Sequence, residues 1–440
     1  MSFQQGLSGL NTSAKALDVV GNNIANANTV GFKTARAEFA DVFAKSLSGS
    51  GASPVGAGAA LATVAQQFTQ GNITSTNSPL DLAINGGGFY MMSANGALTY
   101  SRNGQFQLDK EGFVIDAGQR RLQGYVPQDL GGPIVPSSPE DIFVDPSDLP
   151  PNITSEISMG VNLDSRSAPI DGLTNPFDRN NPLTYTASTS QSVFDSLGNP
   201  HVLSYYFVKT PTAAEWLVYG SVDGTSPAGV DFGAGFNAPA NLTFTTGGAV
   251  ATINGVPAAP VVNAAIDLTQ VFTELNATVP IPVPALVNSA AATIPFATFD
   301  MTSLTQFGSP FGVNALNQNG YSSGRLAGLS VSSEGLVQGR YTNGQSRDLA
   351  QVTLARFTNP NGLVSLGGNQ WQETDDSGQA LIGVPGSGSN GLIKSAAVEE
   401  ANVDLTAELV AMITLQRSYQ ANAQTIKTQE SILQTLVNLR

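Results

Sequence analysis

The chain has 440 residues, which is more than one compact core accommodates, so we expect two to four domains. Its net charge of −14 and its lack of a basic cluster argue against binding to nucleic acid or to an anionic membrane surface. The absence of cysteine excludes disulfides, thiol nucleophiles and zinc–thiolate sites.

The first 33 residues predict a helix that packs lengthwise against other helices. It carries only Lys15 and Asp18 as charges before Lys33, so we expect even its polar face to be buried in an assembly. The Asn- and Gly-rich stretch from 21 to 28 favours an end of the helix. Apolar residues recur at alternating steps of four and three, the spacing of a coiled-coil seam, at Phe3, Leu7, Leu10, Leu17 and Ile24.

Residues 34–70 predict a connecting segment, with a short helix over 34–47 and a flexible Gly- and Ser-rich loop over 48–58. Residues 61–127 predict antiparallel β-structure, because apolar and polar residues alternate there. Asn-Gly pairs at 85–86, 95–96 and 103–104 are typical of tight hairpin turns between strands.

Residues 150–320 predict an inserted outer β-domain. Residues 202–208 and 216–219 are its clearest strands, whereas 225–300 is a charge-poor stretch without a specific assignment. Residues 321–395 return to the earlier alternation, with Asn343-Gly344 at a turn, and are expected to complete an inner β-domain with 71–149. The fold class is therefore mainly β with terminal α-helices.

The last segment, 396–440, predicts a long helix with Asn402 or Asp404 as its N-cap. We expect it to pair with residues 1–33 as a coiled coil, and both ends to be largely disordered until the chain assembles. An intramolecular helical hairpin in a monomer is the alternative, but it would leave uncharged polar faces to solvent. The apolar positions of this helix are Leu405, Leu409, Met412, Tyr419, Ile426, Leu433 and Val437.

Candidate chemistry is sparse. His201 is the only histidine, and its place between a turn and a strand favours packing over a Ser-His-Asp triad. Residues 386–391 fit G-x-G-x-x-G, but the next predicted helix begins too late for a dinucleotide site. Asp375-Asp376 lacks the spacing of a calcium loop. We therefore predict no catalytic, cofactor or metal residues, and no enzyme.

Long motifs at both ends resemble those of the flagellar rod and hook axial proteins. Residues 70–89 resemble a second signature of that family, and 402–405, 416–422 and 425–429 resemble its C-terminal segment. The chain's length and inserted domain favour the hook members of this family. Residues 193–209 also resemble a segment of the outer domain of hook proteins. The first motif, over residues 22–33, contains Asn22, Asn23, Asn26, Gly31, Phe32 and Lys33.

The resemblance implies a structural subunit that self-assembles into a hollow, bendable tube linking the flagellar rod to the filament and transmitting motor torque. It implies rod, hook-cap and hook-filament junction proteins as partners of the homopolymer. It also implies export by the flagellar type III apparatus to the cell exterior without a cleaved signal peptide and without membrane insertion. A distal rod protein and a secreted β-rich surface-binding module are the alternatives.

Overall fold

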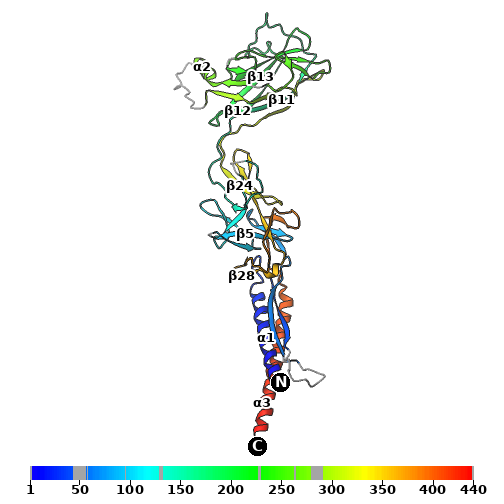
Figure 1. The fold of residues 1–440 in the computed structure, drawn as a ribbon. Helices are drawn as coiled ribbons and strands as arrows, with labels where there is room; N and C mark the ends of the chain where they lie inside the picture. Colours follow the sequence, from blue (N-terminus) through cyan, green and yellow to red (C-terminus); the bar gives the residue numbers. More distant parts are fainter. Residues whose placement is uncertain are drawn as a thin grey trace. The chain divides into compact units, whose positions relative to one another are not determined.

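The computed structural model describes residues 2–42, 56, 58–94, 96–127, 132–225, 229–261, 264–278 and 291–438. The chain forms two compact units, which we call unit 1 (residues 1–146, 326–340 and 346–440) and unit 2 (147–325 and 341–345). Strands predominate in both, and the two long helices lie at the ends of the chain (Figure 1). The prediction of a mainly β chain with paired terminal helices is confirmed.

The helical part of unit 1 consists of α1 (Ser2–Ala25) and α3 (Leu405–Asn438), accompanied by the antiparallel strands β1 (Ala35–Val42) and β2 (Gly58–Gln66). The prediction of a short helix over 34–47 is therefore wrong for the described residues up to Val42, which form a strand. Residues 43–47 lie outside the description. Pairing of Ala35 with Gln66 and of Val42 with Gly58 outweighs the weak helical preference of this segment. Most of the predicted loop at 48–58 also lies outside the described residues.

In the described residues, the β-part of unit 1 is built around a 13-stranded sheet. Its main order is β24 (Leu326–Val331), β25 (Leu336–Tyr341), β26 (Ser346–Val352), β9 (Arg121–Tyr125), β5 (Phe89–Ala94), β6 (Ala97–Ser101), β29 (Gln370–Gln372) and β28 (Val364–Gly367). The sheet combines strands that precede unit 2 in the sequence with strands that follow it: Tyr125 pairs with Gln351, and Tyr90 pairs with Leu354. An aromatic cluster of Phe68, Phe89 and Trp371 packs edge to face beside it.

The remaining elements of unit 1 are β3 (Ile73–Ser75), β4 (Leu82–Asn85), β7 (Gln107–Leu108), β8 (Val114–Ile115), β10 (Glu140–Asp141), β27 (Leu354–Arg356), the 3₁₀ turn η1 (Pro360–Gly362), β30 (Leu381–Gly383), β31 (Leu392–Ser395) and β32 (Ala397–Glu399).

The Asn-Gly pairs divide into two kinds. Asn343-Gly344 connects the paired strands β25 and β26, as a hairpin turn should. Strands β5 and β6, on either side of the pair at 95–96, also pair with each other, but Asn95 lies outside the described residues. The hairpins predicted at 85–86 and 103–104 are wrong. Asn85 is the last residue of β4, and β4 pairs with the distant strand β31 (Leu392–Ser395) instead of with the next strand in the sequence. Gly104 instead lies against Leu82, whose N–H donates to the Gly104 carbonyl at 2.8 Å.

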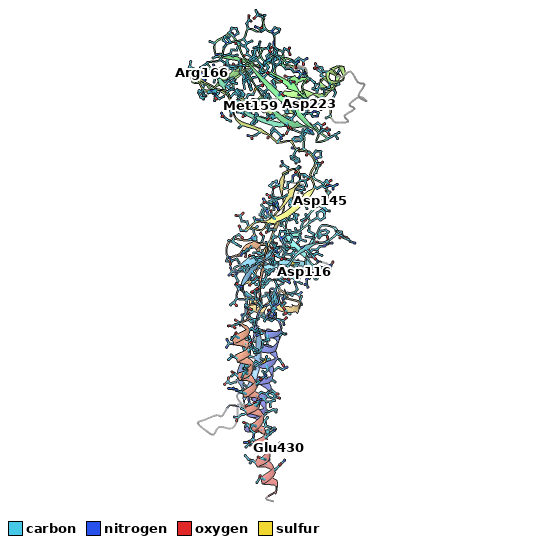
Figure 2. All side chains as sticks on the ribbon, turned by 180° about the vertical axis from the view of Figure 1, so that it is seen from behind. Asp116, Asp145, Met159, Arg166, Asp223 and Glu430 are labelled. Carbon is cyan, nitrogen blue, oxygen red and sulfur yellow. The ribbon has the colours of Figure 1, made fainter. Side chains whose placement is uncertain are left out.

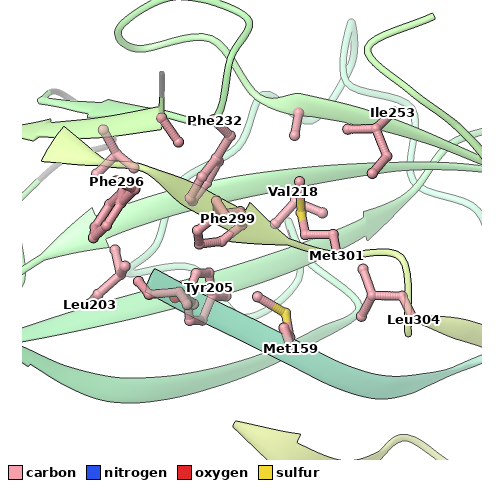
Figure 3. Close-up of a cluster of buried hydrophobic side chains, with 14 of the residues drawn as sticks. Met159, Leu203, Tyr205, Val218, Phe232, Ile253, Phe296, Phe299, Met301 and Leu304 are labelled. Atoms are coloured by element: carbon pink, nitrogen blue, oxygen red, sulfur yellow. The ribbon is translucent and has the colours of Figure 1, made fainter. Parts of the chain in front are cut away.

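The described part of unit 2 contains sheets of six, four and three strands. Its core joins Met159, Tyr205, Phe232 and Phe299, all of which are buried (Figure 3). The stretch 225–300, unassigned from the sequence, contributes buried residues such as Phe232, Ile266 and Phe296, and the helix α2 (Leu268–Thr278), to this core. Asp267 caps α2 by accepting the Thr269 N–H at 2.9 Å.

The elements of unit 2 are β11 (Glu156–Asp164), β12 (Ala187–Phe194), β13 (Pro200–Lys209), β14 (Glu215–Val222), β15 (Val230–Asp231), β16 (Ala240–Phe244), β17 (Val250–Ile253), β18 (Val256–Pro257), β19 (Ala264–Asp267), α2 (Leu268–Thr278), β20 (Thr293–Phe296), β21 (Thr298–Asp300), β22 (Thr305–Phe307) and β23 (Gly312–Gln318).

Candidate assembly interface

The terminal helices pair antiparallel through small and polar residues. A Cβ built on Gly6 would lie 3.2 Å from Ile426, and one on Gly9 would lie 2.8 Å from the Asn422 amide. The Ser13 and Ser418 hydroxyls are 3.3 Å apart further along. Because a Cβ at Gly9 would clash, glycine at this position allows the two helices to approach closely.

The buried positions of α1 are offset by one residue from the predicted apolar seam. Gly6, Ser13, Ala16 and Asn23 are buried, at the heptad spacing of a helix packed against a partner. One residue corresponds to a rotation of about 100° around the helix. The predicted seam consequently lies at the side of this contact, with Phe3 and Leu7 exposed and Leu10, Leu17 and Ile24 half-buried.

On α3 the offset holds only in part, because the predicted seam residue Ile426 lies against Gly6 of α1. Asn422 and Ser418 face α1, while Leu409 is 46% exposed and Leu433 is 56% exposed. Of the predicted residues, Leu405 and Tyr419 are also exposed, Met412 and Ile426 are half-buried, and the Val437 side chain lies outside the description. We call the outward-facing residues of the two helices the apolar stripes: Phe3, Leu7, Leu10, Leu17, Leu405, Leu409, Met412, Tyr419 and Leu433. Such exposure on helices already paired within the chain indicates a surface for a further partner.

The first sequence motif lies where α1 meets the β-part of unit 1. The buried Asn23 amide donates to the Ala35 carbonyl at 2.8 Å and to Glu408 at 3.2 Å, and accepts the Ala35 N–H. Gly31 has a φ of 72°, and a Cβ there would lie 2.5 Å from the Asn103 nitrogen. Asn22 is exposed, and Asn26 and Phe32 are half-buried, so these motif positions contribute through turn geometry.

Lys33 belongs to a buried ion cluster that the sequence analysis missed. Its ammonium lies 2.6 Å from Glu399 Oε1, and Arg102 Nη1 lies 3.3 Å from Glu399 Oε2. Glu399 also accepts the Gly71 N–H at 2.8 Å, and Lys33 donates to the Thr69 carbonyl at 2.7 Å. Burial lowers the pKa of both Lys33 and Arg102, although the Glu399 charge opposes this effect. No local signal indicated these partners, because Glu399 lies 366 positions from Lys33.

In unit 2, His201 lies between two carboxylates. Its Nδ1 is 2.6 Å from Asp223 Oδ2, and its Nε2 is 3.6 Å from Asp195 Oδ2. Burial lowers the pKa of His201, but the hydrogen bond and charge of Asp223, together with Asp195, outweigh burial and raise the pKa above its usual 6.5. A Ser-His-Asp triad needs one ring nitrogen on the serine hydroxyl, whereas both nitrogens of His201 face carboxylates, which favours the packing interpretation.

We expect unit 2 to lose stability as pH rises. A histidine whose pKa is higher in the folded state contributes stability that is complete below its unfolded pKa of about 6.5 and is lost as pH passes the folded pKa. NMR titration is direct, because the chain has one histidine. Asp223→Asn should lower the His201 pKa, and His201→Gln should remove this pH-dependent loss in denaturant unfolding. A His201 pKa at or below 6.5 in the native chain would contradict the expectation.

The G-x-G-x-x-G segment at 386–391 connects two strands, β30 and β31. Its turn closes by a 3.0 Å hydrogen bond from the Gly386 N–H to the Gly391 carbonyl. A dinucleotide site requires a helix that opens on the glycines.

Among the described residues, no helix is long and apolar enough to cross a membrane.

Four family models match the chain. They are described as flagella basal body rod protein (residues 3–33), flagellar hook protein FlgE/F/G D1 domain (83–160), flagellar basal body protein FlaE D2 domain (162–321) and flagellar basal body rod FlgEFG protein C-terminal (394–439). The matches cover the helical ends, residues 83–160 of the first β-region and residues 162–321.

Relatives match over the whole chain. The flagellar hook protein FlgE of Salmonella typhimurium is 40% identical over 446 residues, covering 100% of both chains. FlgE of Escherichia coli K12 is 39% identical with the same coverage. FlgE of Borreliella burgdorferi is 35% identical over 458 residues, covering 100% of this chain and 99% of that protein. On the evidence of these full-length matches and of the matched hook and rod domains, the chain belongs to the flagellar hook protein family.

Proposed function

We propose that this chain is the structural subunit of a bacterial flagellar hook, polymerising into a hollow, bendable tube that links rod to filament and transmits motor torque. The observation that carries the proposal is the pair of apolar stripes, because most of their members stay exposed although α1 and α3 already pack together: Phe3, Leu7, Leu405, Leu409, Tyr419 and Leu433. Full-length similarity to proteins named flagellar hook protein favours this function over the distal rod protein and the surface-binding module.

The proposal divides the mechanical work between the two units. The stripes bury apolar area at about 25 cal/mol per Å² when copies pack, which gives strong contacts along the helices. Unit 2 presents polar uncharged strands, as in β12, where Ser188, Ser190 and Ser192 are exposed. Wet contacts between such side chains exchange at low cost. Firm helical contacts with exchangeable outer contacts allow bending without loss of torque.

The proposed partners are further copies of the chain, the flagellar rod, the hook cap and the hook-filament junction proteins. We also propose passage through the flagellar type III export apparatus to the cell exterior, without a cleaved signal peptide. The role is structural, and it requires no catalytic group. The test is whether the purified chain forms tubes by electron microscopy and restores swimming to a bacterium lacking its hook protein. A chain that stays monomeric and restores no motility would reject the proposal.

We further expect the helical ends to order fully only on assembly. An exposed helix is marginally stable without packing, so light proteolysis of the monomer should remove residues 2–25 and 405–438 before it cuts the β-parts. Mass spectrometry of the surviving core measures this, and assembled polymer serves as the protected control. Ends that resist the protease in a monomer confirmed by sedimentation would favour the intramolecular hairpin alternative.

A further inference from the structure

One end of α3 extends beyond its partner. Gly6, near the start of α1, already faces Ile426, so the last turns of α3 continue past the amino end of α1 (Figure 1). Every described side chain from 430 to 435 is exposed, including Ile432 at 47% and Leu433 at 56%. We call residues 430–438 the overhang, and Glu430 marks its beginning on α3 in Figure 2.

At the other end of the helical pair, a groove of about 570 Å³ opens between α1, β1 and α3. This volume lies within the range of about 300–1,000 Å³ typical of binding pockets. The groove continues the α1–α3 contact, because the buried seam residues Ala16 and Asn23 also line it. Seven of the twelve other lining residues are apolar, namely Val19, Val20, Ala35, Ala37, Phe39, Ala411 and Leu415.

The overhang and the groove are chemically complementary. The overhang exposes Ile432 and Leu433, and the groove offers an apolar lining that can cover them. Glu430 is the only charged residue of the overhang, and the groove lining contains one cation, Arg36, and one anion, Glu408, so the match rests on the apolar side chains. The two features belong to one continuous helix, where 15 to 30 residues, or about 22 to 45 Å, separate the overhang from groove residues 408–415. A helix cannot fold back over itself, so the two can meet only between copies.

We propose that the overhang of one copy occupies the groove of the next copy. This inference rests on the proposed function and names the contact by which the subunits stack. The contact joins two different surfaces, so it is heterologous and propagates as a helical filament instead of closing into a dimer. Copies joined in this way are offset along α3 by about 22 to 45 Å.

Disulfide cross-linking tests the contact cleanly, because the natural chain has no cysteine. Val20→Cys in the groove is combined with Leu433→Cys in the overhang of the same full-length chain. The matched control combines Leu433→Cys with Lys15→Cys, a position on α1 whose side chain is 63% exposed and lies outside the groove lining. Both variants are polymerised in reductant, imaged and then oxidised. We expect the Val20 pair to form a ladder of covalent trimers and larger species that the control pair does not form.

Tubes of the Val20 pair that give no ladder, or none beyond the control, would overturn the contact while leaving self-assembly intact. Failure of the unmodified chain to form any tube would instead count against the proposed function. A second variant ends at Gln429 and retains the whole groove. It should keep its fold by circular dichroism yet stay monomeric at concentrations where the full chain polymerises. Tubes as stable as those of the full chain would also overturn the contact.

Discussion

Leu409→Asp is expected to abolish polymer formation while leaving the monomer folded. Leu409 is 46% exposed in the single chain, so the substitution removes little intramolecular packing. In a polymer the same side chain would be buried, which contributes about 1.5–3 kcal/mol for leucine, and an aspartate there adds the cost of desolvating a charge. Because 1.4 kcal/mol corresponds to a factor of ten, the critical concentration should rise by about 100-fold or more.

Sedimentation and electron microscopy at matched concentrations measure this effect. Leu173→Asp is the matched control, since it makes the same change at a leucine of unit 2 that is 95% exposed. We expect the control to polymerise, and both variants to retain the circular dichroism and unfolding midpoint of the parent. Normal polymer from Leu409→Asp would refute the assignment of the apolar stripe on α3 to assembly.

Glu399→Gln is expected to produce the largest loss of folding stability. Glu399 is the carboxylate that pairs with both Lys33 and Arg102, and the side chains of Lys33 and Glu399 are 0% exposed. Removing its charge leaves two buried cations without an anionic partner, and breaking a buried ion pair in this way costs about 3–5 kcal/mol. Both cations are buried, which lowers their pKa, so water cannot replace the charge that Glu399 supplies.

Thermal and denaturant unfolding of the full chain measure the loss, which should affect the transition of unit 1. The neighbouring Glu400→Gln makes the same change at an exposed residue whose one described side-chain contact is a 3.3 Å hydrogen bond from Asn72. Exposed polar contacts contribute little, so the control should stay within about 1 kcal/mol of the parent. Equal stability of the two variants would show that the buried ion cluster of Lys33, Arg102 and Glu399 does not stabilise unit 1.

Local patterns in the sequence determined the helical ends and the β character of the interior. The four-three spacing from Phe3 to Ile24 and from Leu405 to Leu433 is a property of neighbouring turns, so it predicts a helix wherever the segment lies. Asp404 acts as the predicted N-cap of α3, since it accepts the Thr406 N–H at 2.9 Å, whereas Asn402 instead bonds Thr34 and Gln67. A cap depends on the next three residues alone, which is why it is readable locally.

Tertiary structure alone decided which surfaces meet. Within the chain, α1 and α3 pair through Gly6, Gly9 and Ser13, because small residues let two backbones approach, and this turns the larger apolar residues outward. Asn85-Gly86 is no hairpin because β4 finds its partner at β31, about 300 positions away. Lys33 finds Glu399 in the same way. Periodicity and turn chemistry act over a few residues, whereas the choice of partner depends on the free energy of the whole folded chain.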